Sequence, residues 1–376
     1  MNLRRFVSGA LSRAKIARLS GFRSGVLTRR HEILKVIVDL KTEPLKIVSI
    51  GGGTGLSTLL RGVKRYARAG RGGVEITAVV TVTDDGGSSG RLRREFDVLP
   101  PGDIRNCIVA LSEDETLLTK LFQYRFSNGR GLKGHSFGNL FLTAMTHLTG
   151  DFGTAVKLSS EVLAALGRIY PSTAANVALE ATLADGSKVL GESKISRTRS
   201  RIEKIELRPY RPKPLPETLE AIAEADLITI GPGSLFTSVI PNLLVEGIPR
   251  AIAQSRALKA YFLNLMSQPG ETTNFRASDH VEAIFRHARR SVIDVCVINT
   301  RSIRGKALTR YRAQAAQPVQ IDVPALEHMG LEILGVDLLR KSGVKPEEKI
   351  RHDQGALGAV VLELAERGRS AKMEKA

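Results

Sequence analysis

Residues 47–57 read Ile47-Val48-Ser49-Ile50-Gly51-Gly52-Gly53-Thr54-Gly55-Leu56-Ser57, and this stretch decides the fold. The apolar run that ends at Ile50 is typical of a buried parallel strand. Apolar residues then recur with helical spacing at Leu56, Leu59, Leu60 and Val63. The pattern therefore predicts a strand, a tight glycine loop and a helix.

The glycine loop is a candidate phosphate site. Glycine tolerates positive φ and allows backbone N–H groups to approach a ligand, and the start of a helix attracts anions. The alternative is a plain turn, for which one or two glycines suffice. Neither standard fingerprint is met, because Leu56 occupies the third glycine position of G-x-G-x-x-G and no Gly-Lys-Ser/Thr follows. The candidate binding residues here are Gly51, Gly52, Gly53, Thr54 and Gly55.

A second predicted strand, residues 74–82, ends in Thr83-Asp84-Asp85-Gly86-Gly87. In a doubly wound sheet, ligands lie beyond the carboxyl ends of the strands. Asp84 and Asp85 are therefore candidates for binding ribose hydroxyls or a Mg²⁺ ion that bridges phosphates. Helix capping and turn formation are the alternative roles. Asp84 follows Gly51 by 33 residues, more than the usual spacing of about 20 for a ribose-binding acid, so its role stays open.

Two further polar segments precede predicted helices. In residues 100–106, Asp103 is expected to cap a helix. Residues 134–138 match G-x-S-x-G, but a nucleophile elbow requires a preceding strand, and residues 127–133 form a polar loop. We therefore reject a serine hydrolase and expect Ser136 to cap a helix with Asn139 at its mouth.

Residues 172–210 differ in character from the rest of the chain. Apolar residues alternate up to Asp185-Gly186, a strong hairpin signal, which predicts a small β insertion. The predicted organisation is a basic N-terminal extension (1–43), the first part of a nucleotide-binding domain (44–171), the insertion (172–210) and the second part of the domain (211–370).

A second strand–glycine–helix unit occupies residues 225–244 and contains Gly231-Pro232-Gly233-Ser234. Two such loops can face one another across the switch point of a doubly wound sheet. The predicted fold class is therefore α/β, a Rossmann-like doubly wound, mostly parallel sheet with a small β insertion. Gly231, Gly233 and Ser234 join the candidate binding residues.

Three residues in the second half of the chain have competing interpretations. His280 and His287 share a helix face, but without a third ligand nearby we expect surface residues rather than a metal site. Arg351, before the last predicted helix, can reach a phosphate, although an ordinary exposed arginine is the alternative.

Composition indicates a protein of a reducing compartment that suits small phosphorylated ligands. The net charge is +18, and eight of the basic residues lie in the first thirty positions, where no acid occurs. Aromatic residues make up 5% with no Trp, so we expect no specific nucleic-acid binding. Two cysteines, Cys107 and Cys296, argue against a disulfide framework. The extension resembles a transit peptide or a helix with weak membrane association, but a flexible basic extension is the favoured interpretation.

Six motifs together resemble the bacterial gluconeogenesis factor family, which is related to 2-phospho-L-lactate transferase. They are GGGTGLSTLLRG at 51–62, DDGGSSGRLR at 84–93, PPGDIRN at 100–106, GHSFGNL at 134–140, GPGSLFTSVIPNLLVEGI at 231–248 and QPGETTNF at 268–275.

The resemblance implies a cytoplasmic protein with a Rossmann-like core that binds UDP-sugars such as UDP-N-acetylglucosamine. It also implies a role in growth on gluconeogenic carbon sources, in cell shape and in cell-wall synthesis, with an effector protein as partner and a homo-oligomer as the assembly. Residues 52–55 should contact phosphate, with Asp84 and Asp85 beside it, and Arg351 matches a family arginine linked to sugar-nucleotide binding.

The related transferase leaves the question of catalysis open. Its Mg²⁺-assisted chemistry needs positioning and charge neutralisation rather than a nucleophile, so Asp84 would be the catalytic and metal-binding residue of a transferase. A similar site can also bind without reacting. We favour a ligand-sensing regulator over an enzyme, with a Mg²⁺-dependent transferase as the alternative.

Overall fold

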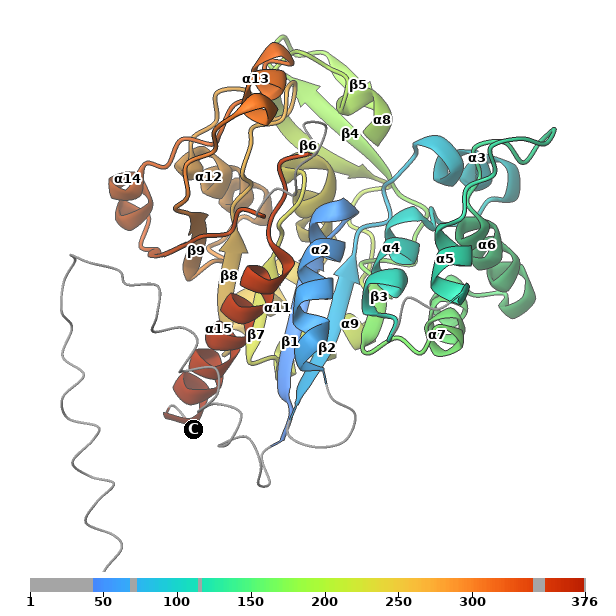
Figure 1. Cartoon of the computed structure of the whole chain (residues 1–376), viewed down its shortest axis with the longest axis horizontal. Coiled ribbons are helices and arrows are strands. Elements are labelled where there is room, and N and C mark those ends of the chain that lie inside the picture. The colour runs from blue at the N-terminus through green and yellow to red at the C-terminus, as the bar shows by residue number, and fades with distance from the viewer. Residues whose placement is uncertain (1–42, 68–72, 114–116, 341–348, 375–376) are drawn as a thin grey trace, which may run out of the picture. The chain divides into compact units, whose positions relative to one another are not determined.

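The computed structural model describes residues 43–67, 73–113, 117–340 and 349–374 (Figure 1). The expectations for residues 1–42 of the basic extension lie outside this part. Residues from Glu43 onward form one compact unit around a seven-stranded sheet. Its strands are β1 (Leu45–Gly51), β2 (Val74–Val80), β3 (Arg168–Pro171), β7 (Leu227–Ile230), β8 (Leu258–Phe262), β9 (Val295–Asn299) and β10 (Glu332–Val336).

The strand order identifies the switch point of the sheet. The order is β10-β9-β8-β7-β1-β2-β3, and every neighbouring pair is parallel. The chain thus moves from β1 toward β3, then returns to β7 on the other side of β1. Since the direction of winding reverses between β1 and β7, ligands are expected above that pair. The predicted fold class is confirmed.

Helices cover both faces of this sheet, as parallel strands require (Figure 1). On one face, α2 (Gly53–Val63) and α15 (Gln354–Glu374) lie side by side, and α9 (Pro216–Glu224) and α11 (Ile248–Gln254) cover the other. The other helical segments outside the insertion are η2 (Lys64–Tyr66), α3 (Gly87–Phe96), α4 (Gly102–Leu111), α5 (Leu117–Gln123), α6 (Phe137–Thr149), α7 (Phe152–Val162), η3 (Leu235–Val239), α10 (Ile240–Leu243), α12 (Ala277–Ala288), α13 (Lys306–Ala313) and α14 (Val323–His328).

The β insertion is a separate antiparallel sheet in the order β5-β4-β6. It consists of β4 (Ala178–Leu183), β5 (Lys188–Leu190) and β6 (Ile202–Arg208), with the short helix α8 (Glu192–Ile195) between the last two. The hairpin predicted at Asp185-Gly186 is confirmed, because Gly186 has φ +79° and donates its N–H to the Leu183 carbonyl. The alternation of β4 buries Leu179 and Leu183 on one face.

Neither histidine of α12 is a surface residue as we expected, because His280 is buried and His287 is half-buried. His280 is 0% exposed and its Nδ1 lies 3.1 Å from the Tyr261 hydroxyl. His287 Nδ1 lies 2.7 Å from the Ala283 carbonyl, and its Nε2 accepts the Ile205 N–H at 3.0 Å. Burial lowers the pKa of both rings to about 4. Spacing along the helix identified a shared face but could not show that this face packs inward.

Cys107 and Cys296 are buried free thiols, as expected for a chain without a disulfide framework. Among the described residues, no helix is both long and apolar enough to cross a bilayer. Both observations agree with the composition of the chain.

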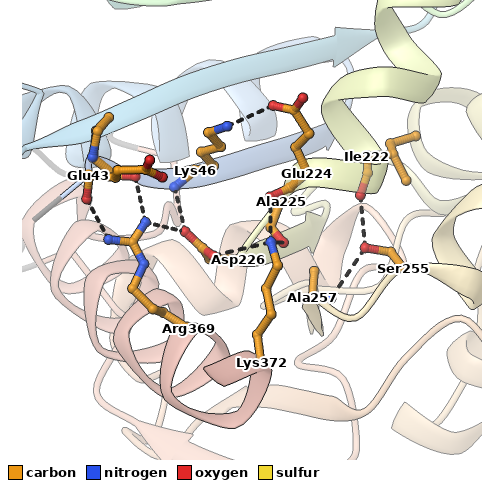
Figure 2. A network of polar contacts seen from close by, with 11 residues as sticks. Glu43, Lys46, Ile222, Glu224, Ala225, Asp226, Ser255, Ala257, Arg369 and Lys372 are labelled. Carbon is orange, nitrogen blue, oxygen red and sulfur yellow. Dashed lines mark hydrogen bonds and ion pairs between the residues drawn. The ribbon is translucent and has the colours of Figure 1, made fainter. Parts of the chain in front are cut away.

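Asp226 is the centre of a polar network at the end of the sheet where β1 and β7 begin, opposite the glycine loops (Figure 2). Its Oδ2 accepts the Lys46 N–H at 2.9 Å and the Arg369 guanidinium at 2.5 Å. Lys372 lies 3.6 Å from Oδ1 and donates to the carbonyl of Glu224 at 2.8 Å. The network therefore ties the last two turns of α15 to the starts of the central strands.

We expect Asp226→Ala to lower the free energy of unfolding by about 2 kcal/mol, because it leaves two cations without their buried carboxylate. This loss is smaller than the loss usual for a fully buried ion pair, because the side chains of Arg369 and Lys372 are partly exposed. Urea unfolding measures the change, with Asp294→Ala as the control because Asp294 pairs at a more exposed position. A loss no greater than that of the control would contradict the structural role of Asp226.

Candidate functional site

The two glycine loops are in contact at the switch point. A Cβ built on Gly55 would lie 2.2 Å from the Pro232 carbonyl oxygen, and one on Gly233 would lie 3.4 Å from that of Gly52. Gly51 itself is the last residue of β1, and its carbonyl accepts the Thr81 N–H at 3.0 Å. The candidates Gly51–Gly55 and Gly231–Ser234 are therefore brought together by the fold.

The first loop presents backbone rather than side chains. Gly53 begins α2 with φ +63°, in the left-handed region that favours glycine. A Cβ on Gly52 would lie 2.6 Å from Thr81 Cγ2 and 2.8 Å from Asp103 Oδ2, so no side chain fits there. The N-cap position of α2, Gly52, supplies no side-chain cap. This is the arrangement in which the start of a helix accepts an anion.

Two side chains that sequence reasoning missed hold the second loop. Asn264 Nδ2 donates to the Gly233 carbonyl at 2.8 Å, and its Oδ1 accepts the Gly233 N–H at 3.3 Å. Gln268 Nε2 donates to the Ser234 hydroxyl at 2.7 Å. Asn264 follows β8, the neighbour of β7, and Gln268 opens the QPGETTNF motif. Their position after a parallel strand is the feature of the sequence that could have identified them as site residues.

A polar cleft of about 250 Å³ adjoins the first loop. Asp84 and Asn139, both predicted from sequence, line it together with Asp103, Arg105 and Arg125. The cleft thus combines two carboxylates with two guanidinium groups. Such a mixture suits a phosphorylated ligand with a cation beside it.

Asp103 has a different role from the helix cap that we expected. The N-cap of α4 is Pro101, which makes no side-chain cap bond. The Asp103 carboxylate instead accepts the backbone N–H of Gly53 and lies beside Asp84. Burial, and then the charge of Asp84, raise the pKa of Asp103 to about 7. This carboxyl group therefore joins the glycine loop to the cleft.

Arg105 and Asn139 are fixed by the start of α6. Arg105 Nη1 donates to the Ser136 hydroxyl at 2.7 Å, and burial lowers the pKa of this guanidinium. Ser136 caps α6 by accepting the Asn139 N–H at 3.2 Å, as predicted. Asn139 Oδ1 is buried without a hydrogen-bond partner among the described residues. An unpaired buried acceptor in a cleft is a position for a ligand or an ion.

The G-x-S-x-G segment lacks the geometry of a nucleophile elbow. Only an isolated bridge between Arg125 and Ser136 precedes α6, so no strand leads into the serine. His135 Nδ1 lies 3.0 Å from the Ser88 hydroxyl, while Ser136 interacts with Arg105. These contacts agree with the rejection of a serine hydrolase.

Two predicted binding residues, Asp85 and Arg351, lie neither in the glycine loops nor in the lining of the cleft. Asp85 Oδ1 accepts the Ser193 N–H at 2.7 Å and so ties the insertion helix α8 to the loop that follows β2. Arg351 is exposed, and its carbonyl accepts the Arg340 N–H at 3.0 Å. Arg351 could therefore contact only a part of a ligand that extends out of the cleft.

The residues of the cleft fit a magnesium ion held jointly with phosphate. Mg²⁺ in such sites takes one or two carboxylates, with waters and phosphate oxygens completing the shell. Asp84 and Asp103 supply the carboxylates, and the unpaired Asn139 oxygen adds an acceptor. Within the described part of the chain, no group of three or more His, Cys, Asp or Glu could hold a metal alone.

Comparison with known proteins gives one consistent family. A family model described as 2-phospho-L-lactate transferase CofD matches residues 47–339. A putative gluconeogenesis factor of Nostoc is 51% identical over 84% of this chain and 68% of its own length. The gluconeogenesis factor of Bacillus subtilis is 46% identical over 85% of this chain and 98% of its own. A crystal structure from Bacillus halodurans, 45% identical, superposes with a TM-score of 0.81 and covers 85% of this chain and 100% of that one.

Proposed function

We propose that this chain, which belongs to the 2-phospho-L-lactate transferase CofD family and to its gluconeogenesis factors, is a regulatory protein that binds a UDP-sugar. The observation that carries the proposal is the contact between two glycine loops at the switch point. A diphosphate needs closely spaced backbone N–H groups, and we assign this role to N–H groups of the two loops other than those of Gly53 and Gly233, which bond Asp103 and Asn264.

The cleft beside the first loop suits the polar end of such a ligand. Its volume of about 250 Å³ is too small for a whole nucleotide-sugar, whose pockets usually measure about 300–1,000 Å³. We therefore assign the diphosphate to the loops and one phosphate with its sugar to the cleft. Arg105 and Arg125 would neutralise phosphate charge there.

Magnesium would be held by Asp84 and Asp103, where it would neutralise the phosphate oxygens of a bound nucleotide. The chain's own groups do the rest: Arg105 orients phosphate, and the Gly53 N–H fixes the Asp103 carboxylate. The preference for sensing over group transfer rests on the relatives named gluconeogenesis factors, because the carboxylates and guanidinium groups of the cleft would serve either role.

The wider role follows from family membership. We propose a cytoplasmic regulator of growth on gluconeogenic carbon sources, linked to cell-wall synthesis and cell shape through an effector protein. Sugar-nucleotide binding would report the supply of wall precursor to that effector, and the homo-oligomer that we expect remains part of this proposal.

Titration calorimetry with UDP-N-acetylglucosamine tests the binding proposal. We expect saturable binding that is strengthened by Mg²⁺, whereas GDP and NAD should bind weakly. Asp84→Asn should remove most of the Mg²⁺ enhancement, because it leaves one carboxylate in the cleft. Asp185→Asn, in the exposed hairpin of the insertion, is the matched control. Equal affinity for all three nucleotides would contradict the assignment of ligand.

Incubation with UDP-sugars and Mg²⁺ separates a regulator from a transferase. We expect the nucleotide to remain intact over hours, because a regulatory site binds its ligand without reacting with it. Steady release of UDP, or a transferred group, that disappears in Asp84→Asn would establish the transferase instead.

A further inference from the structure

A second and larger cavity lies away from the glycine loops. This groove of about 880 Å³ is formed by β6, by the connection from α10 to α11, and by the last turn of α12. It shares no lining residue with the polar cleft. The groove therefore needs an explanation of its own.

The groove is lined with excess positive charge. Three acidic residues, Glu203, Glu206 and Glu246, face six basic ones. The basic residues are Lys204, Arg211, Arg250, Arg286, Arg289 and Arg290. Lys204 pairs with Glu206 at 2.5 Å, but the five arginines form no ion pair or side-chain hydrogen bond with the described residues. Clustered guanidinium groups without carboxylate partners are the usual receptors for phosphate.

An aromatic ring and an apolar floor accompany this charge. Tyr210 lines the groove with 58% of its surface exposed, and the Arg208 guanidinium covers its ring at 3.6 Å. Ile205, Leu207 and Val245 are buried beneath. An exposed ring backed by a guanidinium is a platform on which a base can stack.

We propose that the groove binds a nucleotide, with its phosphates on the arginines and its base on Tyr210. The volume lies within the range of about 300–1,000 Å³ that is usual for small-ligand pockets. A single exposed ring serves one base, whereas a polymer site would interleave several.

The floor of the groove is rigidly attached to the core. His287 Nε2 accepts the Ile205 N–H at 3.0 Å, and its ring packs edge-on against Phe236 of η3, with centroids 6.0 Å apart. Leu243, which lines the groove, follows Asn242, whose side chain donates to the Gly51 carbonyl at 3.2 Å. A preformed groove favours binding without a large ordering cost.

The test is calorimetric titration of the full chain with ADP and with pyrophosphate. We expect Arg286→Glu with Arg290→Glu to weaken the groove-binding phase at least tenfold for both probes. Lys157→Glu with Arg256→Glu, two exposed positions outside the groove, makes the same charge change and should leave both affinities unaltered. Tyr210→Leu should weaken ADP about tenfold and spare pyrophosphate, because only ADP stacks.

Several outcomes would overturn the proposal. They are unchanged ADP binding in the double variant, equal losses in the control pair, or tighter and steeply salt-dependent binding of a single-stranded DNA 20-mer, which would assign the groove to a polymer. If the double variant unfolds by circular dichroism, Arg211→Gln with Arg250→Gln tests the opposite wall. The Mg²⁺-strengthened binding of UDP-N-acetylglucosamine, assigned to the glycine loops, should be unchanged in the same variants, so failure here is distinguishable from failure at the glycine loops.

Discussion

Replacement of Asp103 by asparagine should raise the free energy of unfolding at pH 8 by roughly 3 kcal/mol and weaken Mg²⁺-dependent ligand binding. Burial and the neighbouring Asp84 raise the pKa of Asp103 to about 7, from 3.8 in the unfolded chain. Above pH 7 the folded protein therefore holds an ionised carboxylate at an energetic cost. Asparagine removes that charge, and its oxygen can still accept the Gly53 N–H.

The pH dependence gives this prediction its sign. A raised pKa in the folded state means that the contribution of Asp103 to stability is complete below pH 3.8 and is lost as pH rises through about 7. The advantage of Asp103→Asn should therefore shrink on acidification and vanish near pH 4. Urea unfolding between pH 4 and pH 8 measures it, while calorimetry with UDP-N-acetylglucosamine and Mg²⁺ follows binding.

Asp151→Asn is the matched control for Asp103→Asn. Asp151 caps α7, and the hydrogen bond from the Thr154 N–H lowers the pKa of its carboxyl group. The same substitution there should give no gain at pH 8. If Asp103→Asn were no more stable than wild type at pH 8, burial of the ionised Asp103 carboxylate would not destabilise the wild-type protein. Unchanged Mg²⁺ dependence would exclude Asp103 as a metal ligand.

The central strands were predictable because each is an apolar run followed by a glycine-rich or polar loop. Neither β3 nor β10, the two edges of the sheet, was predicted from the sequence. β3 has four residues and ends in Pro171, and β10 is only half-buried along its length. Neither carries a strong strand pattern, since each is specified by parallel pairing with its inner neighbour.

The site was partly predictable for a related reason. Residues after the carboxyl ends of strands, such as Asp84 and the glycine loops, follow from the topology of doubly wound sheets. Asp103 and Arg105 lie in the first turn of a helix, where acidic residues are common for reasons of capping alone. Only the packing of α4 against the first loop directs Asp103 toward Gly53.

Replacement of Gly55 by alanine should abolish UDP-sugar binding and lower the free energy of unfolding by about 3 kcal/mol, the upper end of the usual cost of overpacking. The added Cβ would lie 2.2 Å from the Pro232 carbonyl oxygen and 2.9 Å from the Gly233 nitrogen. Both atoms are backbone, so relief requires the two loops to separate. Separation would also pull apart the N–H groups assigned to the diphosphate.

Gly51→Ala, four residues earlier, isolates this effect from a general sensitivity of the loop to alanine. The nearest atom to a Cβ on Gly51 is Leu56 Cβ at 3.6 Å, an ordinary van der Waals distance, and this residue already lies in β1. We expect Gly51→Ala to retain wild-type stability and at least about a third of the affinity, a change below 1 kcal/mol. Calorimetry and urea unfolding on the pair decide the matter. Equal tolerance of alanine at both positions would mean that contact between the loops is not required for binding.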